Sequence, residues 1–351
     1  MRCVVNRIAH SIAAATVLVL VASAPAAAQQ NIAREITRNV TTVAKVSAIA
    51  AAAGQKKSEF TFEQKDVKTE KLAIGPTGQV SLRNIVGSIT VKAGGGNEAS
   101  LEIIRLSRGK TDADAKLGLE KVTVDVNVRG ERATVETRYP DDRRPDYAVS
   151  VSYNLTAPAG TGVTIDSISG ELMVTGLRGD VVAHVISGKI DLSNCSKVSS
   201  ARTTSGHITL NNVQSAGNLE VEGISGDLHL TNVKATRVSA SIVSGTIVAS
   251  DVQADSASLS AMSGDITYSG GVAPKGRYEF RAHSGTVKLG LTGGFDLEAR
   301  TFSGSVKTDA SLGMTTTTSN AKSVRGTAGN GGAVVVATTF SGSVWVGRTI
   351  K

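Results

Sequence analysis

The dipeptide Ser-Gly returns nine times between residues 169 and 342, and this repetition constrains the fold more than any other feature of the chain. Neighbouring copies lie 18 to 21 residues apart, except that 38 residues, or two steps with one marker lost, separate the last two. The copies are Ser169-Gly170, Ser187-Gly188, Ser205-Gly206, Ser225-Gly226, Ser244-Gly245, Ser263-Gly264, Ser284-Gly285, Ser303-Gly304 and Ser341-Gly342. A fixed period of about 19 residues is typical of a stacked array of repeats.

Each repeat also alternates apolar and polar residues around its Ser-Gly copy. The second residue after every Gly is aliphatic, namely Leu172, Ile190, Ile208, Leu228, Ile247, Ile266, Val287, Val306 and Val344. A column of mostly smaller apolar residues stands four positions before each Ser. Because side chains on a strand point to alternate faces, the pattern predicts two half-buried strands per repeat.

The two strands of a repeat are predicted to be joined by corners. Glycine suits the Ser-Gly corner because it has no Cβ to clash when φ is positive. At the opposite phase, residues that tolerate a left-handed turn recur: Gly176, Asn194, Asn212, Asn232 and Asp251. Cys195 falls in the apolar column that follows this second corner, so we expect a packed structural thiol rather than a reactive one.

Coils of this kind stack at about 4.8 Å, and only stacking makes their apolar core continuous. The sequence therefore predicts an all-β chain in which residues 160–351 form a β-solenoid of roughly 19-residue coils. Residues 60–159 are β-rich but irregular, and we expect them to begin and cap the array. Residues 315–332 are rich in Thr, Ser and Gly, which predicts a loop in place of one coil.

Within the capping region, individual elements can be predicted. They are a weak repeat at 85–91, strands at 101–106 and 122–128, a short helix at 112–120, and a hairpin of strands 132–139 and 147–155.

Residues 1–28 have the pattern of a secretion signal, in which a basic start precedes an apolar stretch and a small-residue cleavage site. Its removal would leave no transmembrane anchor and would lower the net charge from +8 to +6. We therefore expect an exported protein that is periplasmic, associated with the cell surface, or secreted. Residues 29–59 are predicted to be a helical or flexible linker, in which the helical spacing over 31–50 fits either a cap over one solenoid end or a tether.

Composition argues against several ligand classes. Aromatic residues make up 3% of the chain and the basic residues are spread rather than clustered, so we do not expect a nucleic-acid partner. The histidines downstream of the signal fall at different phases or on distant coils, which predicts no metal site: His184, His207, His229 and His283. No motif for a cofactor is evident.

Stacked β-coils can also carry polysaccharide lyases and glycoside hydrolases, so an enzyme is the alternative function. Asp227 and Asp265 occupy the same position after Ser-Gly, two coils and therefore about 9.6 Å apart. An inverting glycosidase needs two carboxylates separated by about 6.5–9.5 Å. We favour a mixed surface ladder at this position, in which Lys189 faces Glu171 and His207 faces Asp227.

The residue directly before each Ser forms a further column: Ile168, Ile186, Thr204, Ile224, Val243, Met262, His283, Phe302 and Phe340. We expect this column to face the core, whereas an outward column would be an apolar stripe of the kind that marks a binding site. Phe302, Phe340 and Trp345, near the C-terminal end, are the expected contacts with a partner, either an envelope polysaccharide or another surface protein.

The pattern resembles an exported bacterial family of unknown function named "putative adhesin". The resemblance covers about residues 75–351 and rests on segments 155–165, 176–179, 329–332 and 340–344, together with the repeated Ser-Gly-x-aliphatic units. It implies a secreted, non-enzymatic β-solenoid-like domain and transfers no catalytic residues. The leading hypothesis is an exported, non-catalytic surface, scaffold or adhesin-like binding module of the cell envelope. A role as an accessory to envelope-stress signalling is a third hypothesis, which the sequence does not address.

Overall fold

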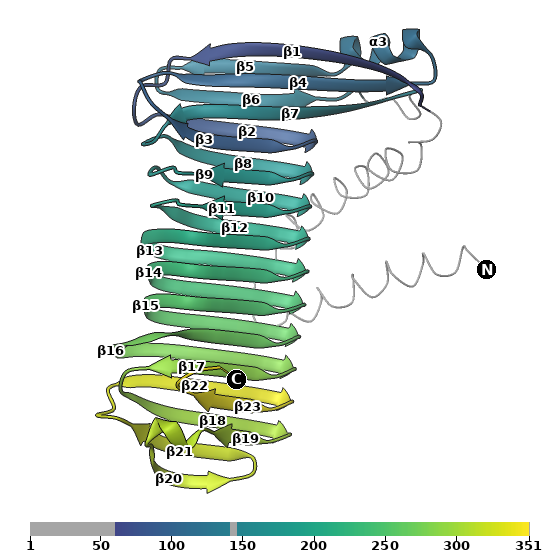
Figure 1. Ribbon diagram of the computed structural model, residues 1–351. Coiled ribbons are helices and arrows are strands. Elements are labelled where there is room, and N and C mark those ends of the chain that lie inside the picture. Colours follow the sequence, from purple (N-terminus) through teal and green to yellow (C-terminus); the bar gives the residue numbers. More distant parts are fainter. Residues whose placement is uncertain (1–59, 141–145, 351) are drawn as a thin grey trace, which may run out of the picture. The chain divides into compact units, whose positions relative to one another are not determined.

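The computed structural model describes residues 60–140 and 146–350, and these form a β-solenoid whose coils stack along one axis (Figure 1). Two parallel sheets face each other, and each coil contributes one strand segment to each sheet. The central strands are β8 (Gly162–Ser169), β9 (Leu172–Thr175), β10 (Val181–Ser187), β11 (Ile190–Ser193), β12 (Val198–Ser205), β13 (Ile208–Ser225), β14 (Leu228–Ser244), β15 (Ile247–Ser263), β16 (Ile266–Ser284) and β17 (Val287–Thr292). The predicted fold class is confirmed.

The Ser-Gly corner needs glycine for two reasons. All nine glycines have φ between 130° and 151°, a backbone conformation that other residues rarely adopt. In addition, a Cβ at any of them would lie only 1.6–2.1 Å from the carbonyl oxygen of a corner glycine in the adjacent coil. The column extends to Gly87, in the segment predicted as a weak repeat. The glycine backbones therefore stack directly on one another.

The second corner is also as predicted. Asn194, Asn212, Asn232 and Asp251 have φ between 51° and 54°, in the left-handed region. The amide Nδ2 of Asn212 donates to Oδ1 of Asn194 at 2.6 Å, and Nδ2 of Asn232 donates to Oδ1 of Asn212 at 3.1 Å. These exposed amides thus link successive coils in addition to shaping the turn.

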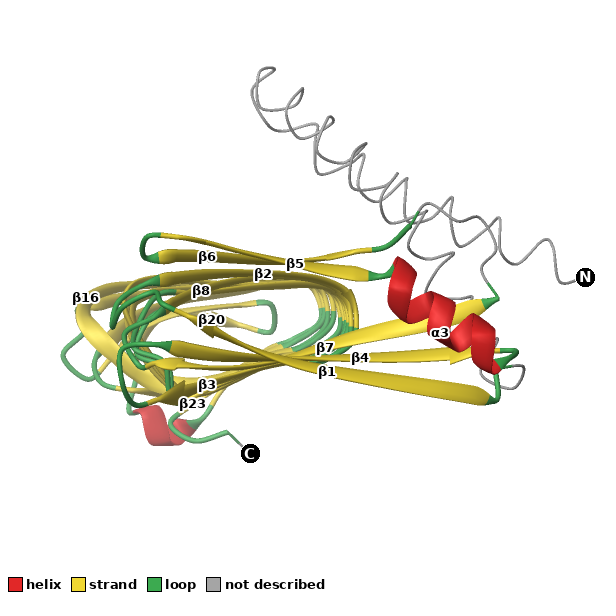
Figure 2. Ribbon diagram, turned by 90° about the horizontal axis from the view of Figure 1, so that it is seen from above, coloured by secondary structure: helices red, strands yellow, loops and turns green. Residues whose placement is uncertain are grey.

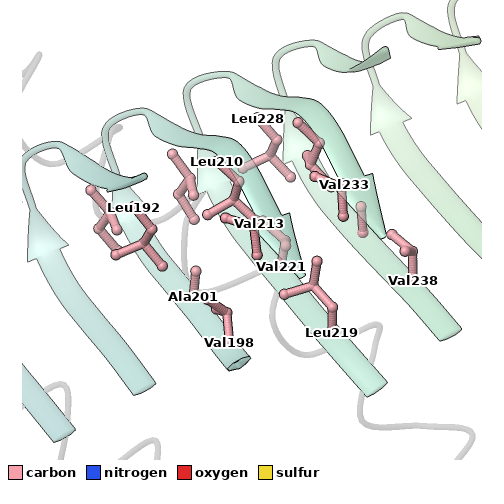
Figure 3. Packing of buried hydrophobic residues seen from close by; sticks show 14 of the residues in the cluster. Leu192, Val198, Ala201, Leu210, Val213, Leu219, Val221, Leu228, Val233 and Val238 are labelled. Carbon is pink, nitrogen blue, oxygen red and sulfur yellow. The ribbon is translucent and has the colours of Figure 1, made fainter. Parts of the chain in front are cut away.

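The core lies between the two sheets and is built from the aliphatic columns. Figure 3 shows Leu192, Leu210 and Leu228 stacked from coil to coil, with Val198 and Leu219 from the opposite strands. Cys195 is buried in the same core, which confirms the packed thiol. Burial raises the pKa of this thiol, and backbone hydrogen bonds oppose the shift only partly.

At the N-terminal end the chain is interleaved rather than stacked in sequence order. The strands are β1 (Phe62–Leu72), β2 (Gln79–Val86), β3 (Ile89–Gly94), β4 (Ala99–Gly109), β5 (Thr123–Arg129), β6 (Arg132–Arg138) and β7 (Tyr147–Pro158), with helix α3 (Asp112–Lys121). Strand β2 lies between β6 and β8, and β3 lies between β7 and β9. Strands β1, β4 and β7 extend beyond the coils and carry α3 (Figure 2).

The predicted hairpin of 132–139 with 147–155 is wrong. Strand β6 pairs with β5 and β2, whereas β7 pairs with β4 and β3. The two strands lie in opposite sheets, where the hydroxyls of Thr137 and Tyr153 meet across the core. Both segments alternate correctly, but alternation alone does not select which neighbour a strand pairs with.

The C-terminal end is interleaved as well. It contains β18 (Phe295–Ser303), β19 (Val306–Thr308), the 3-10 helix η1 (Ala310–Leu312), β20 (Thr315–Asn320), β21 (Ser323–Ala328), β22 (Ala333–Ser341) and β23 (Val344–Gly347). Strand β22 inserts between β16 and β18, and β23 inserts between β17 and β19. The corner glycines therefore stack in the order Gly285, Gly342, Gly304.

The loop predicted at 315–332 is also wrong. Strands β20 and β21 form an antiparallel hairpin, and β21 pairs antiparallel with β18 at the end of one sheet. The long interval between the last two Ser-Gly copies is thus a fold-back that returns the chain into the stack. Spacing counts residues along the chain and does not distinguish such a return from two further coils.

Candidate binding surface at the Ser-Gly corner

The residue before each Ser points outward, which corrects the expectation that this column belongs to the core. Ile224 and Phe340 are 48% and 50% exposed, and Phe302 is 67% exposed. The physical reason is that the inward alternation of each strand continues to the second residue before Ser, so the parity slip occurs only at Ser-Gly itself. We call this column the corner stripe; in stacking order it comprises Ile168, Ile186, Thr204, Ile224, Val243, Met262, His283, Phe340 and Phe302.

The C-terminal part of the corner stripe is an aromatic stack. The ring of Phe340 lies between those of His283 and Phe302, with centroid distances of 5.0 Å and 4.8 Å and interplanar angles of 1° and 4°. The ammonium group of Lys322 lies 6.0 Å from the centroid of the Phe302 ring, close enough for a cation–π contact. Phe340 is covered by a ring on both faces and presents its edge to solvent, whereas Phe302 and His283 are each covered by a ring on one face.

Charged side chains flank the aromatic stack and form ion pairs with one another. Arg300 pairs with Glu298 at 2.7 Å, and Arg325 donates to the other oxygen of Glu298 at 2.7 Å. The hydrogen bond from Arg325 lowers the pKa of Glu298, so this carboxylate stays ionised. Arg281 forms a similar pair with Glu279. The border of the stack is therefore polar and carries more positive than negative groups, while the stack itself is apolar.

Trp345 lies on the other side of the corner and does not join this stack. It is in β23, in the second sheet, and within the described residues no ring contact connects it with Phe302 or Phe340. The register of the sheet places Lys288 and Lys307 directly beside it on the two neighbouring strands. The three aromatic residues predicted as binding contacts thus form two separate surfaces.

Asp227 and Asp265, the carboxylates of the alternative enzyme, each brace the next coil. Oδ1 of Asp227 accepts a hydrogen bond from the backbone N–H of Thr246 at 3.0 Å, and Oδ1 of Asp265 accepts one from that of Thr286 at 2.7 Å. His207 lies 3.3 Å from Asp227, as predicted. Lys189 pairs with Asp191 at 3.2 Å instead of with Glu171. Lys189 and Asp191 are two positions apart along the chain, so their side chains point to the same face.

The chain matches the family model described as Toastrack DUF4097 over residues 87–346. The chain belongs to the Toastrack DUF4097 family. This match confirms the resemblance drawn from the Ser-Gly units. A comparison with the curated proteins found no match.

Solved structures similar to this Toastrack domain share little sequence with it. A "putative adhesin" from Bacteroides fragilis NCTC 9343 is 12% identical with a TM-score of 0.41, and the match covers 81% of this chain and 98% of that one. A "putative cell adhesion protein" from Clostridium sporogenes ATCC 15579 is 10% identical with a TM-score of 0.26, covering 82% and 100%. A "putative adhesin" from Parabacteroides merdae ATCC 43184 is 12% identical with a TM-score of 0.29, covering 80% and 96%.

A surface cavity in the described part of this Toastrack domain lies away from the corner stripe. It measures about 590 Å³ and is lined by Thr267, Ser269, Thr292 and Arg348, with Asp251 as its one acidic side chain. A glycosidase requires two carboxylates, and the lining of this cavity supplies only one. Among the described residues, no group of three His, Cys, Asp or Glu side chains is placed to hold a metal ion.

Sequence reasoning missed three members of the two surfaces of this Toastrack domain. His283 was placed in the column before Ser but was not predicted as a binding residue, yet it stacks on Phe340. Lys288 and Lys307 were not predicted as binding residues. They lie 57 and 38 residues before Trp345 in the sequence, although the fold places them on the strands next to it. The only signal available was their shared phase after Ser-Gly, which assigns them to one outward column.

Proposed function

We propose that this Toastrack protein is an exported, non-catalytic module that binds a partner at the cell envelope through its corner stripe. The observation that carries the proposal is the exposure of the stacked Phe302 and Phe340, which are 67% and 50% exposed. Large apolar side chains gathered on a surface usually mark an interaction site. Export rests on the signal pattern at 1–28, which lies, like the linker at 29–59, outside the described residues. No helix in the described ranges is long and apolar enough to cross a membrane.

The geometry of the stack favours another surface protein as the partner. A sugar ring packs against an open aromatic face, but each face of Phe340 is covered by a neighbouring ring. Ring edges pack well against apolar and aromatic side chains of a protein. The ion-paired Arg–Glu border around the stack resembles the polar rim that surrounds an apolar interface core.

Binding can be tested by sedimentation of the purified mature chain with isolated cell envelopes. Replacing both phenylalanines, in Phe302→Ser/Phe340→Ser, should weaken binding at least about tenfold, since buried aromatic anchors dominate interface energies. Val334→Ser is the matched control, because Val334 lies on the same strand as Phe340 and is 41% exposed. Protease treatment of the envelopes should also abolish binding. Equal binding by the double variant and the control would exclude the stripe.

Absence of catalysis is tested separately. The mature chain should release no new reducing or unsaturated ends from a panel of envelope and plant polysaccharides. Both candidate carboxylates are tied to backbone N–H groups, which supports a structural role for them. Product formation that disappears in Asp227→Asn would instead establish the carbohydrate-active enzyme.

A further inference from the structure

We propose that Trp345, Lys288 and Lys307 form a second binding site, which takes an acidic sugar unit of a polysaccharide. This site lies in the second sheet, across the corner from the stripe, and it does not depend on the function proposed for the stripe. Its elements are β17, β23 and β19, which lie side by side although β23 comes last in the sequence.

The orientation of the Trp345 indole is set by Gly347. Both residues point outward from β23, because Val344, which precedes Trp345, and Val346, which lies between the two, are buried. A Cβ at Gly347 would lie 2.3 Å from Cη2, 2.7 Å from Cζ2 and 3.0 Å from Cζ3 of Trp345. Together these distances place the missing Cβ to one side of the plane of the six-membered ring and just outside its Cη2 edge. The far edge of the indole therefore reaches over Gly347 on its own strand, where any larger side chain would collide with it.

This arrangement differs from that of the phenylalanines. Phe302 and Phe340 stand on edge, with their faces turned toward one another. Trp345 is half-buried, and among the described residues it has no ring partner. A partly exposed aromatic side chain that leans along its own strand can contact the C–H groups of a sugar ring, in line with the apolar lining of ligand sites.

Two cations complete the site. Lys288 and Lys307 are in register with Trp345, one on each side, and both side chains are exposed. Neither forms an ion pair with any described residue, unlike the arginines beside the corner stripe. An ammonium group is a compact point charge that binds carboxylate or sulfate oxygens. A ring platform between two unpaired ammonium groups therefore fits a sugar that carries an acidic substituent.

The surroundings favour a polysaccharide over a nucleic acid. Binding of single strands uses successive aromatic platforms for successive bases. Along the outward column of Trp345, the strands on the next coils carry Thr267 and Val248 in place of further aromatic rings. One platform with two cations suits an isolated acidic sugar contact within a longer chain.

The site carries its own probe, because Trp345 is the single tryptophan of the chain. Titration of the mature protein with polygalacturonate, a polymer of uronic acid, should change the tryptophan emission, whereas neutral dextran should not. Lys288→Gln/Lys307→Gln should weaken the response at least about tenfold, a loss of about 1.4 kcal/mol. Lys322→Gln is the matched control, since this lysine lies at the corner stripe, and it should respond like the wild type.

The outcomes separate this proposal from the previous one. Phe302→Ser/Phe340→Ser should lose envelope binding and keep the tryptophan response, so either proposal can fail alone. A response to dextran equal to that for polygalacturonate would overturn the acidic ligand class. A stronger response to a single-stranded oligonucleotide would assign the site to nucleic acid. No response to polygalacturonate, or an undiminished response in the double lysine variant, would remove the site.

Discussion

The middle of the solenoid and its C-terminal end are built from the same repeat but assembled in different ways. From β10 to β16 each coil stacks on the one that precedes it in the sequence. At the C-terminal end, β22 and β23 return from the β20–β21 hairpin and insert one coil inward. The middle carries mostly mixed polar columns, whereas the end carries the aromatic stack and the Trp345 site.

The difference suggests a division of labour between the two regions. Regular stacking makes each coil depend on its neighbours, which gives a rigid interior. Insertion of a strand from farther along the chain ties the outermost coil to residues distant in sequence, and the N-terminal end uses the same device with β2 and β3. At the C-terminal end the inserted coil also supplies Phe340 and Trp345, so one rearrangement builds both candidate surfaces.

The largest effect is expected from adding a methyl group in the regular middle. In Gly226→Ala the new Cβ would lie 1.7 Å from the carbonyl oxygen of Gly206, in a residue with φ of 130°. Both the close contact and the strained backbone should lower the free energy of unfolding by more than about 3 kcal/mol, measured by urea denaturation. Gly217→Ala is the control, since a Cβ there meets no atom within 4 Å. Equal stability of the two variants would refute the stacked-glycine corner.

A smaller, local effect is expected from loosening the inserted strand. Val335 is completely buried in β22, and Val335→Ala should cost about 1–3 kcal/mol. Because repeats depend mainly on their neighbours, hydrogen exchange should rise in β18–β23 and stay unchanged in β13 and β14. Val221→Ala, at an equally buried position in β13, should show the reverse. Uniform acceleration in both variants would show that middle and end unfold as one unit.

The smallest effect concerns the thiol of the regular middle. Burial raises the pKa of Cys195 in the folded state above its value in the unfolded chain. The neutral thiol therefore contributes stability below the unfolded-state pKa of about 8.5, and this contribution is lost as pH rises toward the folded-state pKa. Cys195→Val should reduce the loss of stability above that pH, and the wild-type thiol should react with a disulfide reagent only after unfolding. Rapid labelling of the native protein would contradict a packed coil.

Local features of the fold could be predicted well from the sequence. The Ser-Gly corner, the asparagine turns and the aliphatic columns follow from backbone conformation and alternation, which are properties of short segments. The helix expected at 112–120 is α3, where Thr111 caps the first turn with Asp114. The error at 132–155 concerns which strand lies beside which, and the error at 315–332 is a predicted loop that forms a hairpin of two strands. The domain boundaries, the signal at 1–28 and the linker at 29–59 remain predictions.

The candidate sites could be predicted only in part, for the same reason. Phe302, Phe340 and Trp345 stood out as aromatic residues of one region, but their division into two surfaces depends on the sheet to which each strand belongs. The outward turn of the corner stripe depends on whether the parity slip falls before or after Ser. The two positions of the slip differ by a single residue, and the same pattern in every coil is compatible with both.

By itself, the sequence determined the repeat, its corners and its core, because these features follow from local backbone preferences and from alternation, which recur in every coil. The tertiary structure alone decided the order of the coils at the two ends, and hence that Phe340 meets both His283 and Phe302 and that Trp345 lies between Lys288 and Lys307. The physical reason is that backbone hydrogen bonds join any two strands with matching alternation. Which strands pair is therefore decided by how the whole chain folds back on itself.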